Sequence, residues 1–147
     1  MKLHCEVNAL YIHYQARDLQ AQQHLHIKIK ARSLLLDEQK GLLSQQSVLK
    51  NLIREYKYAG CKNRATLFEE MRKVAVLRRK LLNVNLQCQL IQTKVDELTL
   101  SIEQTRKLIW KLHNKCNKFS GLLARLKAIQ LNKSLSEEES ELEEYLS

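Results

Sequence analysis

The sequence contains no proline and only three glycines. Average usage would give roughly 7 prolines and about 10 glycines. These shortages argue against a turn-rich β-sheet protein, a collagen-like chain and a proline-rich disordered chain. Aromatic residues make up only 5% of the chain, which argues against a compact core built on Phe and Trp. The abundant residues are Leu, Lys, Gln, Glu and Arg, whose straight side chains lose little freedom in a helix. The composition therefore predicts long helices.

Targeting and membrane signals are also missing. No apolar stretch of about 7–15 residues follows the N-terminal Met-Lys-Leu-His-Cys-Glu, so we expect no secretory signal. No apolar run reaches the roughly 18 residues that a membrane span needs. The four cysteines, at positions 5, 61, 88 and 116, form no Cys-x-x-Cys pair and match neither a zinc spacing nor a disulfide framework. We expect a reducing, cytoplasmic location.

The residues needed for catalysis do not converge. Glycines at 41, 60 and 121 cannot form a phosphate-binding loop. His24 and His26 are two positions apart and point to different faces of a helix, so they cannot chelate one ion. Cys88 and Cys116 are interpreted as small apolar residues of a helix seam, and Cys61 as an exposed bystander thiol. We expect no enzyme, no cofactor and no metal site.

Charge is divided unevenly along the chain. Residues 137–147 contain six of the 16 acidic residues and no basic residue, so the first 136 residues hold 25 basic and 10 acidic residues, a net charge of +15. A basic body is compatible with a nucleic acid, an acidic protein or a membrane surface as partner. The acidic tail argues against a simple polyanion binder, because it would compete for the same basic face.

A heptad repeat dominates the second half. All nine a positions are apolar if Cys counts as apolar, and seven of nine d positions are. The a positions are Leu67, Val74, Leu81, Cys88, Val95, Ile102, Ile109, Cys116 and Leu123, and the d positions are Glu70, Leu77, Val84, Ile91, Leu98, Thr105, Leu112, Phe119 and Leu126. A strict repeat of seven over this length is typical of a coiled coil, because a straight helix would drift off it.

The first half repeats the pattern less cleanly. Its predicted a positions are Val7, Tyr14, Ala21, Lys28, Leu35, Leu42, Leu49 and Tyr56, of which seven are apolar. Its predicted d positions are Leu3, Leu10, Arg17, His24, Ala31, Glu38, Gln45 and Leu52, of which only four are apolar. Residues 17–28 form the weakest stretch. Either the long polar side chains reach outward to solvent, or this segment melts until a partner binds.

The two heptad runs predict an antiparallel hairpin. Gly60 suits a helix C′ position, and Thr66 to Glu69 match a capping box. We therefore expect a first helix over 3–58, a turn over 59–65, a second helix over 66–131 and an acidic tail over 132–147. A turn near residue 61 predicts that the numbers of facing residues sum to about 123. This register places Leu35 opposite Cys88 and leaves residues 122–147 as an overhang beyond the first helix. The fold class is all-α.

Two groups of residues are candidate partner-binding sites near the turn and the middle of the second helix. Arg72, Arg78, Arg79 and Lys80, with Lys73, lie outside the a and d positions, either as a solvated flank or as a docking site for an acidic protein surface. Trp110 lies off the seam, as do Leu86, Leu90 and Leu100. Large apolar groups off a seam usually mark contacts. A partner, a third helix or self-association could cover them.

A third candidate is the start of the overhang. Leu122, Leu123, Leu126 and Ile129 form an apolar stripe that the predicted register leaves without an intramolecular partner. A partner could cover this stripe, or residues 122–147 could fray or pack on the first helix. Burial of four such side chains would contribute about 1.5 kcal/mol each.

The segment from Leu67 to Leu81, the tail from Ser136 to Glu144, and the overall layout resemble the SpaM/InvI proteins of bacterial type III secretion. These proteins are the injectisome counterparts of the FliJ and YscO stalk proteins. The resemblance implies a non-catalytic stalk at the cytoplasmic base of the secretion machine. It implies contact with the hexameric secretion ATPase, an export-gate protein and export chaperones, and a role in secretion of invasion proteins. The first 30 residues carry no motif of that family.

The resemblance also implies a polarity, and it leaves alternatives open. By analogy with rotary ATPases, the terminal end would enter the ATPase and the turn end, residues 56–79, would face the gate. One alternative is a cytosolic coiled-coil chaperone or scaffold that binds clients through Trp110 and its apolar neighbours. Another is a basic nucleic-acid-binding coiled coil, which predicts a steep loss of affinity with salt. The scarcity of aromatic residues argues against the nucleic-acid reading, and we expect no insertion into a membrane.

Overall fold

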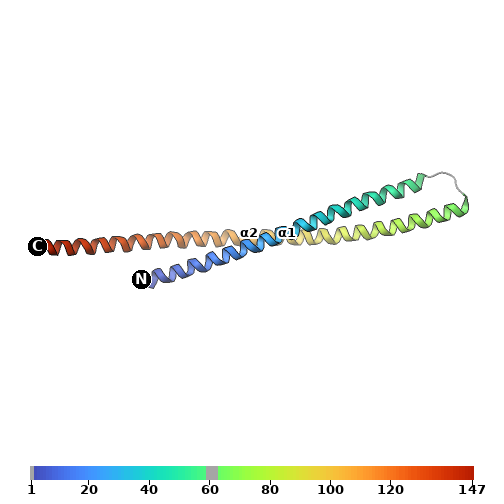
Figure 1. Cartoon of the computed structure of the whole chain (residues 1–147). Coiled ribbons are helices and arrows are strands. Elements are labelled where there is room, and N and C mark those ends of the chain that lie inside the picture. The colour runs from blue at the N-terminus through green and yellow to red at the C-terminus, as the bar shows by residue number, and fades with distance from the viewer. Residues whose placement is uncertain (1, 59–62) are drawn as a thin grey trace. The chain divides into compact units, whose positions relative to one another are not determined.

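Two long α-helices make up the described chain. The computed structural model describes residues 2–58 and 63–147, in which α1 spans Lys2–Tyr58 and α2 spans Arg64–Leu146 (Figure 1). No strand occurs in these two ranges. The absence of proline allows both helices to continue without the break that a missing N–H would cause. The prediction of an all-α helical hairpin is confirmed.

The start of α2 differs from the prediction. The backbone N–H of Leu67 donates to the carbonyl of Asn63 at 2.9 Å, so Asn63 is the N-cap and the helix begins at Arg64. The capping box predicted at Thr66 is therefore wrong, because Thr66 already lies inside the helix. Asn is among the best N-cap residues, and nothing in Arg64 or Ala65 opposes helix formation. The predicted roles of Gly60 and Cys61 lie outside the described residues.

The end of α2 also differs from the prediction. The helix continues to Leu146 rather than ending at residue 131, so most of the acidic tail is helical. Residues 132–146 are mostly Glu, Leu and Ser, and Glu and Leu are strong helix formers. At the end of α2, the backbone N–H of Ser147 donates to the carbonyl of Glu143 at 3.1 Å.

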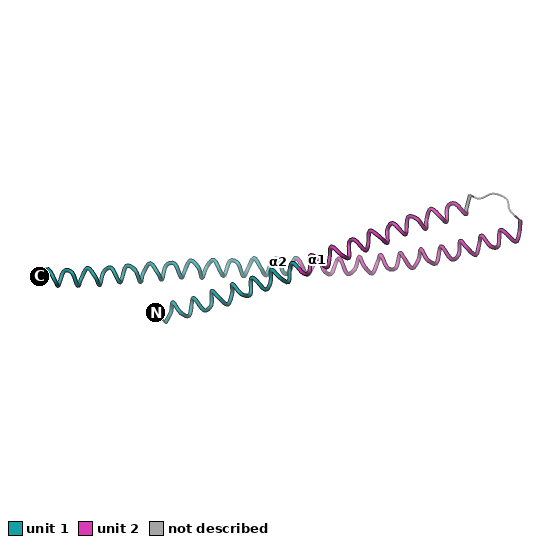
Figure 2. The backbone as a smooth tube through the Cα atoms, in the orientation of Figure 1, with its two compact units in different colours: residues 1–26, 103–147 teal, residues 27–102 magenta. Residues whose placement is uncertain are grey.

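The helices form two compact units, one of residues 1–26 with 103–147 and one of residues 27–102 (Figure 2). We call them unit 1 and unit 2. In unit 2, the side-chain amide of Gln39 donates to Gln92, and that of Gln46 donates to Asn85, both at 2.7 Å. In unit 1, the ring of Tyr14 stacks on that of Phe119 at a centroid distance of 5.5 Å. In each unit, α1 and α2 therefore run antiparallel and side by side.

These contacts correct the predicted register. Facing residues such as Gln39 with Gln92 and Gln46 with Asn85 have numbers that sum to 131, not about 123. The shift of eight residues is about two helical turns. The prediction placed the same number of residues on each side of the turn, whereas residues 64–72 of α2 extend past the position opposite the end of α1. The exposure of Leu67, Phe68 and Met71 follows from this asymmetry.

The heptad predicted for α2 matches the observed burial. Of its eighteen a and d positions, only Leu67 is exposed. The most deeply buried is Ile102, which is 1% exposed. Cys88 is half-buried and Cys116 is buried, as expected for apolar seam residues. This seam is the core of the molecule, since a two-helix hairpin has no other interior.

The second line of the α1 seam was predicted wrongly. All eight predicted a positions of α1 are buried or half-buried, but seven of the eight predicted d positions are exposed. The second seam line instead lies three residues before each a position, and all its members are half-buried: His4, Tyr11, Asp18, Leu25, Arg32, Gln39, Gln46 and Ile53. The sequence did not reveal this seam line because several of its members are polar. Arg17 and His24, which made the stretch 17–28 look weak, point to solvent, and the helix is continuous there.

Candidate partner-binding surfaces

The predicted basic cluster lies on the first turns of α2 in unit 2. Arg72, Arg78, Arg79 and Lys80 are all exposed, as predicted for residues outside the seam. Exposed apolar side chains lie among them, including Val76 and Leu82. A groove of about 310 Å³ opens beside the cluster and is lined by Tyr56, Arg72, Lys73, Val76 and Leu77. The surface therefore combines positive charge with apolar area, which suits an acidic protein partner better than a bare polyanion.

A second groove in unit 2 lies between the two helices and is larger. It has a volume of about 560 Å³ and is lined by Ser44, Gln45, Val48, Leu49, Lys80, Asn83, Val84 and Gln87. Lys80 is the one member of the basic cluster that reaches it. Its apolar floor comes from Val48, Leu49 and Val84, so a partner side chain bound there would contact both helices.

Trp110 lies on α2 in unit 1 and is 67% exposed. It lines a groove of about 290 Å³ with Tyr14, Arg17, Leu108, Lys111, Leu112, Asn114 and Lys115. The ammonium of Lys115 lies 4.9 Å from the ring centroid of Tyr14, within cation–π range. Three basic side chains, those of Arg17, Lys111 and Lys115, therefore line the same groove as the exposed indole. The groove suits an apolar residue flanked by acidic ones.

The apolar stripe at the predicted start of the overhang has a partner after all. Leu126 is half-buried, and Leu126 and Ile129 share a groove of about 600 Å³ with Leu3 and His4 of α1. The prediction that this stripe lacks an intramolecular partner is wrong, because the corrected register brings the start of α1 opposite residues 126–129. Leu122 is 39% exposed, and Ile129 is 62% exposed. On the side of α2, the groove continues through Gln130, Lys133 and Ser134 to Glu137.

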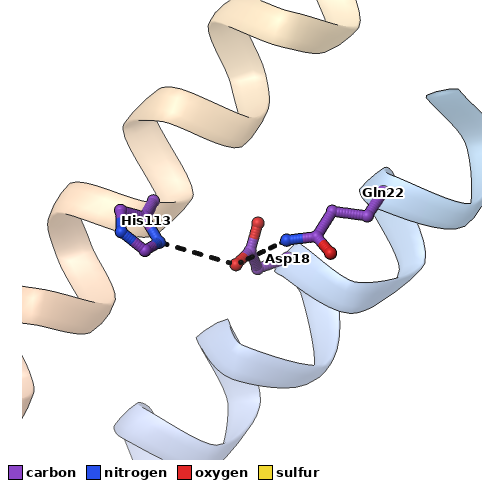
Figure 3. A network of polar contacts seen from close by, with 3 residues as sticks. All are labelled: Asp18, Gln22 and His113. Atoms are coloured by element: carbon purple, nitrogen blue, oxygen red, sulfur yellow. Dashed lines mark hydrogen bonds and ion pairs between the residues drawn. The ribbon is translucent and has the colours of Figure 1, made fainter.

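Polar side chains within the seam form a feature that the sequence prediction missed. Asp18 of α1 accepts a hydrogen bond from Gln22 at 3.4 Å, and His113 Nδ1 of α2 lies 3.9 Å from its Oδ2 (Figure 3). The Asp18 side chain is only 13% exposed, and its buried Oδ1 accepts no hydrogen bond from the described residues. The signal was present: Asp18 lies four residues after Tyr14, in the line that the structure shows to be seam.

Cys116 lies in the same layer of unit 1. Burial raises the pKa of its thiol, and the negative charge of Asp18 raises it further. The thiol is therefore protonated at neutral pH and is a poor nucleophile. This agrees with its interpretation as an apolar seam residue.

The sequence that forms this hairpin matches one known protein family. The model of the Salmonella surface presentation of antigen gene type M protein family matches residues 6–146. The chain belongs to this family. No curated protein and no solved structure matches the chain. The family assignment places this SpaM-family chain among proteins associated with type III secretion.

The match runs from Glu6 to Leu146 and so includes the basic cluster, Trp110 and the stripe from Leu122 to Ile129, whereas Leu3 and His4 lie before it. It extends into the first 30 residues, where the sequence alone offered no family motif. In residues 2–58 and 63–147, no helix is long and apolar enough to cross a membrane. Those same ranges hold no cluster of three metal-ligating side chains.

Proposed function

We propose that this SpaM-family chain is a non-catalytic central stalk of a type III secretion ATPase. In this proposal it links the hexameric ATPase ring to the export gate at the cytoplasmic base of the machine, and secretion of invasion proteins depends on it. The family membership supports the secretion context. The observation that carries the finer role is the exposed basic cluster of Arg72, Arg78, Arg79 and Lys80.

Physical reasoning favours many weak contacts for such a stalk. A single asymmetric hairpin inside a sixfold ring must contact different subunits in turn, so one deep binding pocket would hold it in place. Exposed Arg and Lys provide attraction that is screened by salt and tolerant of small shifts. The grooves beside Arg72 and Trp110 are small, with volumes of about 310 and 290 Å³, and are lined by basic residues, which suits transient contact with acidic side chains.

Charge reversal tests this proposal. The variant R78E/R79E is expected to retain its helicity by circular dichroism, because both side chains are exposed. It is expected to lose co-purification with either the secretion ATPase or the gate protein, and to abolish secretion. The matched control, K94E/K107E, reverses two exposed lysines in the middle of α2, away from the turn and from the terminal end, and should leave these properties unchanged. Unchanged secretion by R78E/R79E would indicate that the cluster is only a solvated flank of the coiled coil.

The polarity of the stalk needs a truncation chosen by the corrected register. Removal of residues 138–147 leaves in place every residue of α2 that lines the groove with Leu3 and His4, whereas truncation after Gly121 would uncover these two residues. If the terminal end enters the ATPase and the turn end faces the gate, loss of 138–147 weakens ATPase binding and preserves gate binding. The opposite result would reverse the polarity.

A chaperone-binding or client-binding role is the second candidate. The exposed Trp110 and its basic surroundings favour it, because an indole with three cations beside it can hold an acidic amphipathic helix. The substitution Trp110→Ala should then abolish binding of an export chaperone while leaving ATPase binding intact. If Trp110→Ala binds both the chaperone and the ATPase as the wild type does, Trp110 has no role in partner binding.

A further inference from the structure

The outer side of α2, opposite the seam, carries two exposed surfaces with the same heptad spacing. In unit 1, the tail face consists of Leu131, Leu135, Glu138, Leu142 and Tyr145. In unit 2, the basic face consists of Arg72, Ala75, Arg79, Leu82 and Leu86. Each set alternates steps of three and four residues, which is the spacing of a coiled-coil seam. The seam with α1 uses other positions of α2, so both faces are free to receive a further helix.

Both faces expose large apolar side chains to solvent. Leu131 is 64% exposed and Tyr145 is 93% exposed in unit 1, and Leu82 is 63% exposed in unit 2. The tail face and its flanks carry negative charge through Glu138 and Glu141. The basic face and its flanks carry positive charge through Arg79 and Arg78. Apolar patches of this kind usually mark contacts, and here the two charges are opposite.

From this complementarity we propose that the basic face of one copy binds the tail face of a second copy, with the two helices antiparallel. When Arg79 is set opposite Glu138, the neighbouring layers follow from the heptad spacing. Ala75 then faces Leu142, Leu82 faces Leu135, and Leu86 faces Leu131. At the ends and flanks of the contact, Arg72 faces Tyr145 and Arg78 faces Glu141, so that every layer pairs apolar with apolar, cation with aromatic ring, or cation with carboxylate.

Neighbouring registers are worse. A shift of one heptad in either direction places Arg79 opposite Leu131 or Tyr145, and Glu138 opposite Arg72 or Leu86. These arrangements break up the three apolar layers. A parallel pairing of two tail faces would bring glutamates against glutamates, which is destabilising. Because each copy carries one basic face and one tail face, two such contacts formed reciprocally make a closed dimer.

The second copy is favoured over another basic helix as occupant because both halves of the complementary pair lie on this chain. The inference does not rest on the proposed stalk function, since it concerns the purified chain alone. If the same basic face also binds the secretion machine, self-pairing and docking compete for Arg78 and Arg79.

Sedimentation equilibrium of the purified full chain tests the proposal through a charge swap. The wild-type chain is expected to dimerise, and R78E/R79E and E138R/E141R are each expected to weaken dimerisation at least tenfold. The chain that carries all four substitutions, and an equimolar mixture of the two double variants, are expected to regain it. The matched control E137R/E144R makes the same change of charge at exposed tail positions on the seam side and should dimerise like the wild type.

The proposal is overturned if the wild-type chain is monomeric, or if the four-fold variant and the mixture fail to regain dimerisation. It is also overturned if E137R/E144R weakens dimerisation as much as E138R/E141R does, since that would indicate a general charge effect. A helicity measurement on each variant separates loss of pairing from loss of fold. A wild-type monomer that binds a synthetic Lys- and Leu-rich helical peptide through Glu138 would assign the tail face to another protein.

Discussion

At the scale of single residues, Asp18 is a nearly buried carboxylate of the seam with incomplete hydrogen bonding. Its side chain is nearly buried between the helices, and one carboxylate oxygen has no hydrogen-bond partner among the described residues. An unsatisfied buried polar group costs about 1–3 kcal/mol. His113 compensates only weakly, because it lies 3.9 Å away and is mostly exposed. Asp18 therefore lowers the stability of unit 1.

Replacement of this carboxylate by an apolar side chain should stabilise the protein. We expect Asp18→Leu to raise the free energy of unfolding by about 1–2 kcal/mol, since leucine suits a seam position and removes the unsatisfied oxygen. Urea denaturation followed by circular dichroism measures the change. The control Asp37→Leu alters an exposed aspartate of the same helix and should change stability by less than about 0.5 kcal/mol. Destabilisation by Asp18→Leu would show that Asp18 is satisfied in solution.

Cys116 predicts a dependence of stability on alkaline pH. Burial raises the pKa of its thiol above the ordinary value of 9.0, so the folded state disfavours the thiolate more than the unfolded state does. This contribution to stability is fully present below pH 9.0 and is lost as pH rises through the folded-state pKa. Cys116→Ala should therefore lose less stability than the wild type between neutral pH and pH above 9.0, by denaturant titration at each pH. Equal losses in both proteins would contradict the assignment.

At the scale of the helices, the sequence predicted the class of structure and one of the two seams well. The α2 heptad was readable because all nine of its a positions and seven of its d positions are apolar. In α1, one line was found for the same reason. The other was missed because its members include Asp18, Arg32, Gln39 and Gln46, which look like surface residues until their partners are known. Gln39 and Gln46 bond to Gln92 and Asn85, and no single-helix pattern contains that information.

The pairing register of α1 and α2 could not be predicted from the sequence either. Heptad spacing permits shifts by about one repeat at little cost in apolar matching, so the choice was made from the position of the turn. The structure selects the register in which polar side chains of the two helices meet. The error in register carried over to the candidate site: Leu126 and Ile129 were taken for an unpartnered stripe, although Leu3 and His4 lie beside them. The exposure of the basic cluster and of Trp110 needed no register and was predicted correctly.

The register gives a direct prediction for crosslinking. In a chain with its native cysteines replaced, a cysteine pair at positions 39 and 92 should be joined by a short bismaleimide within one chain. A pair at positions 35 and 92 should react more slowly, because one further turn separates its members. Mass spectrometry of the monomer band distinguishes the products. Crosslinks that form only between chains would contradict the intramolecular hairpin.

At the scale of the whole molecule, the family assignment and the exposed surfaces belong to one account. The chain belongs to a family associated with type III secretion. Its outer faces expose large apolar side chains beside clustered charges, and the hairpin's own seam does not cover them. Two helices with one seam bury little area per ordered residue, so such a hairpin gains stability from partners. The proposed stalk role, in which an ATPase ring and an export gate would supply part of the order, is consistent with this marginal core.

The central proposal is a stalk, and a single stalk in a sixfold ring requires one copy of this chain for each hexameric secretion ATPase. Native mass spectrometry of the reconstituted complex measures that ratio most directly. The account predicts a species with six ATPase subunits and one chain, and its loss at high salt because the contacts are exposed and charged. A complex with one chain on each ATPase subunit, or no complex at any salt concentration, would contradict the stalk.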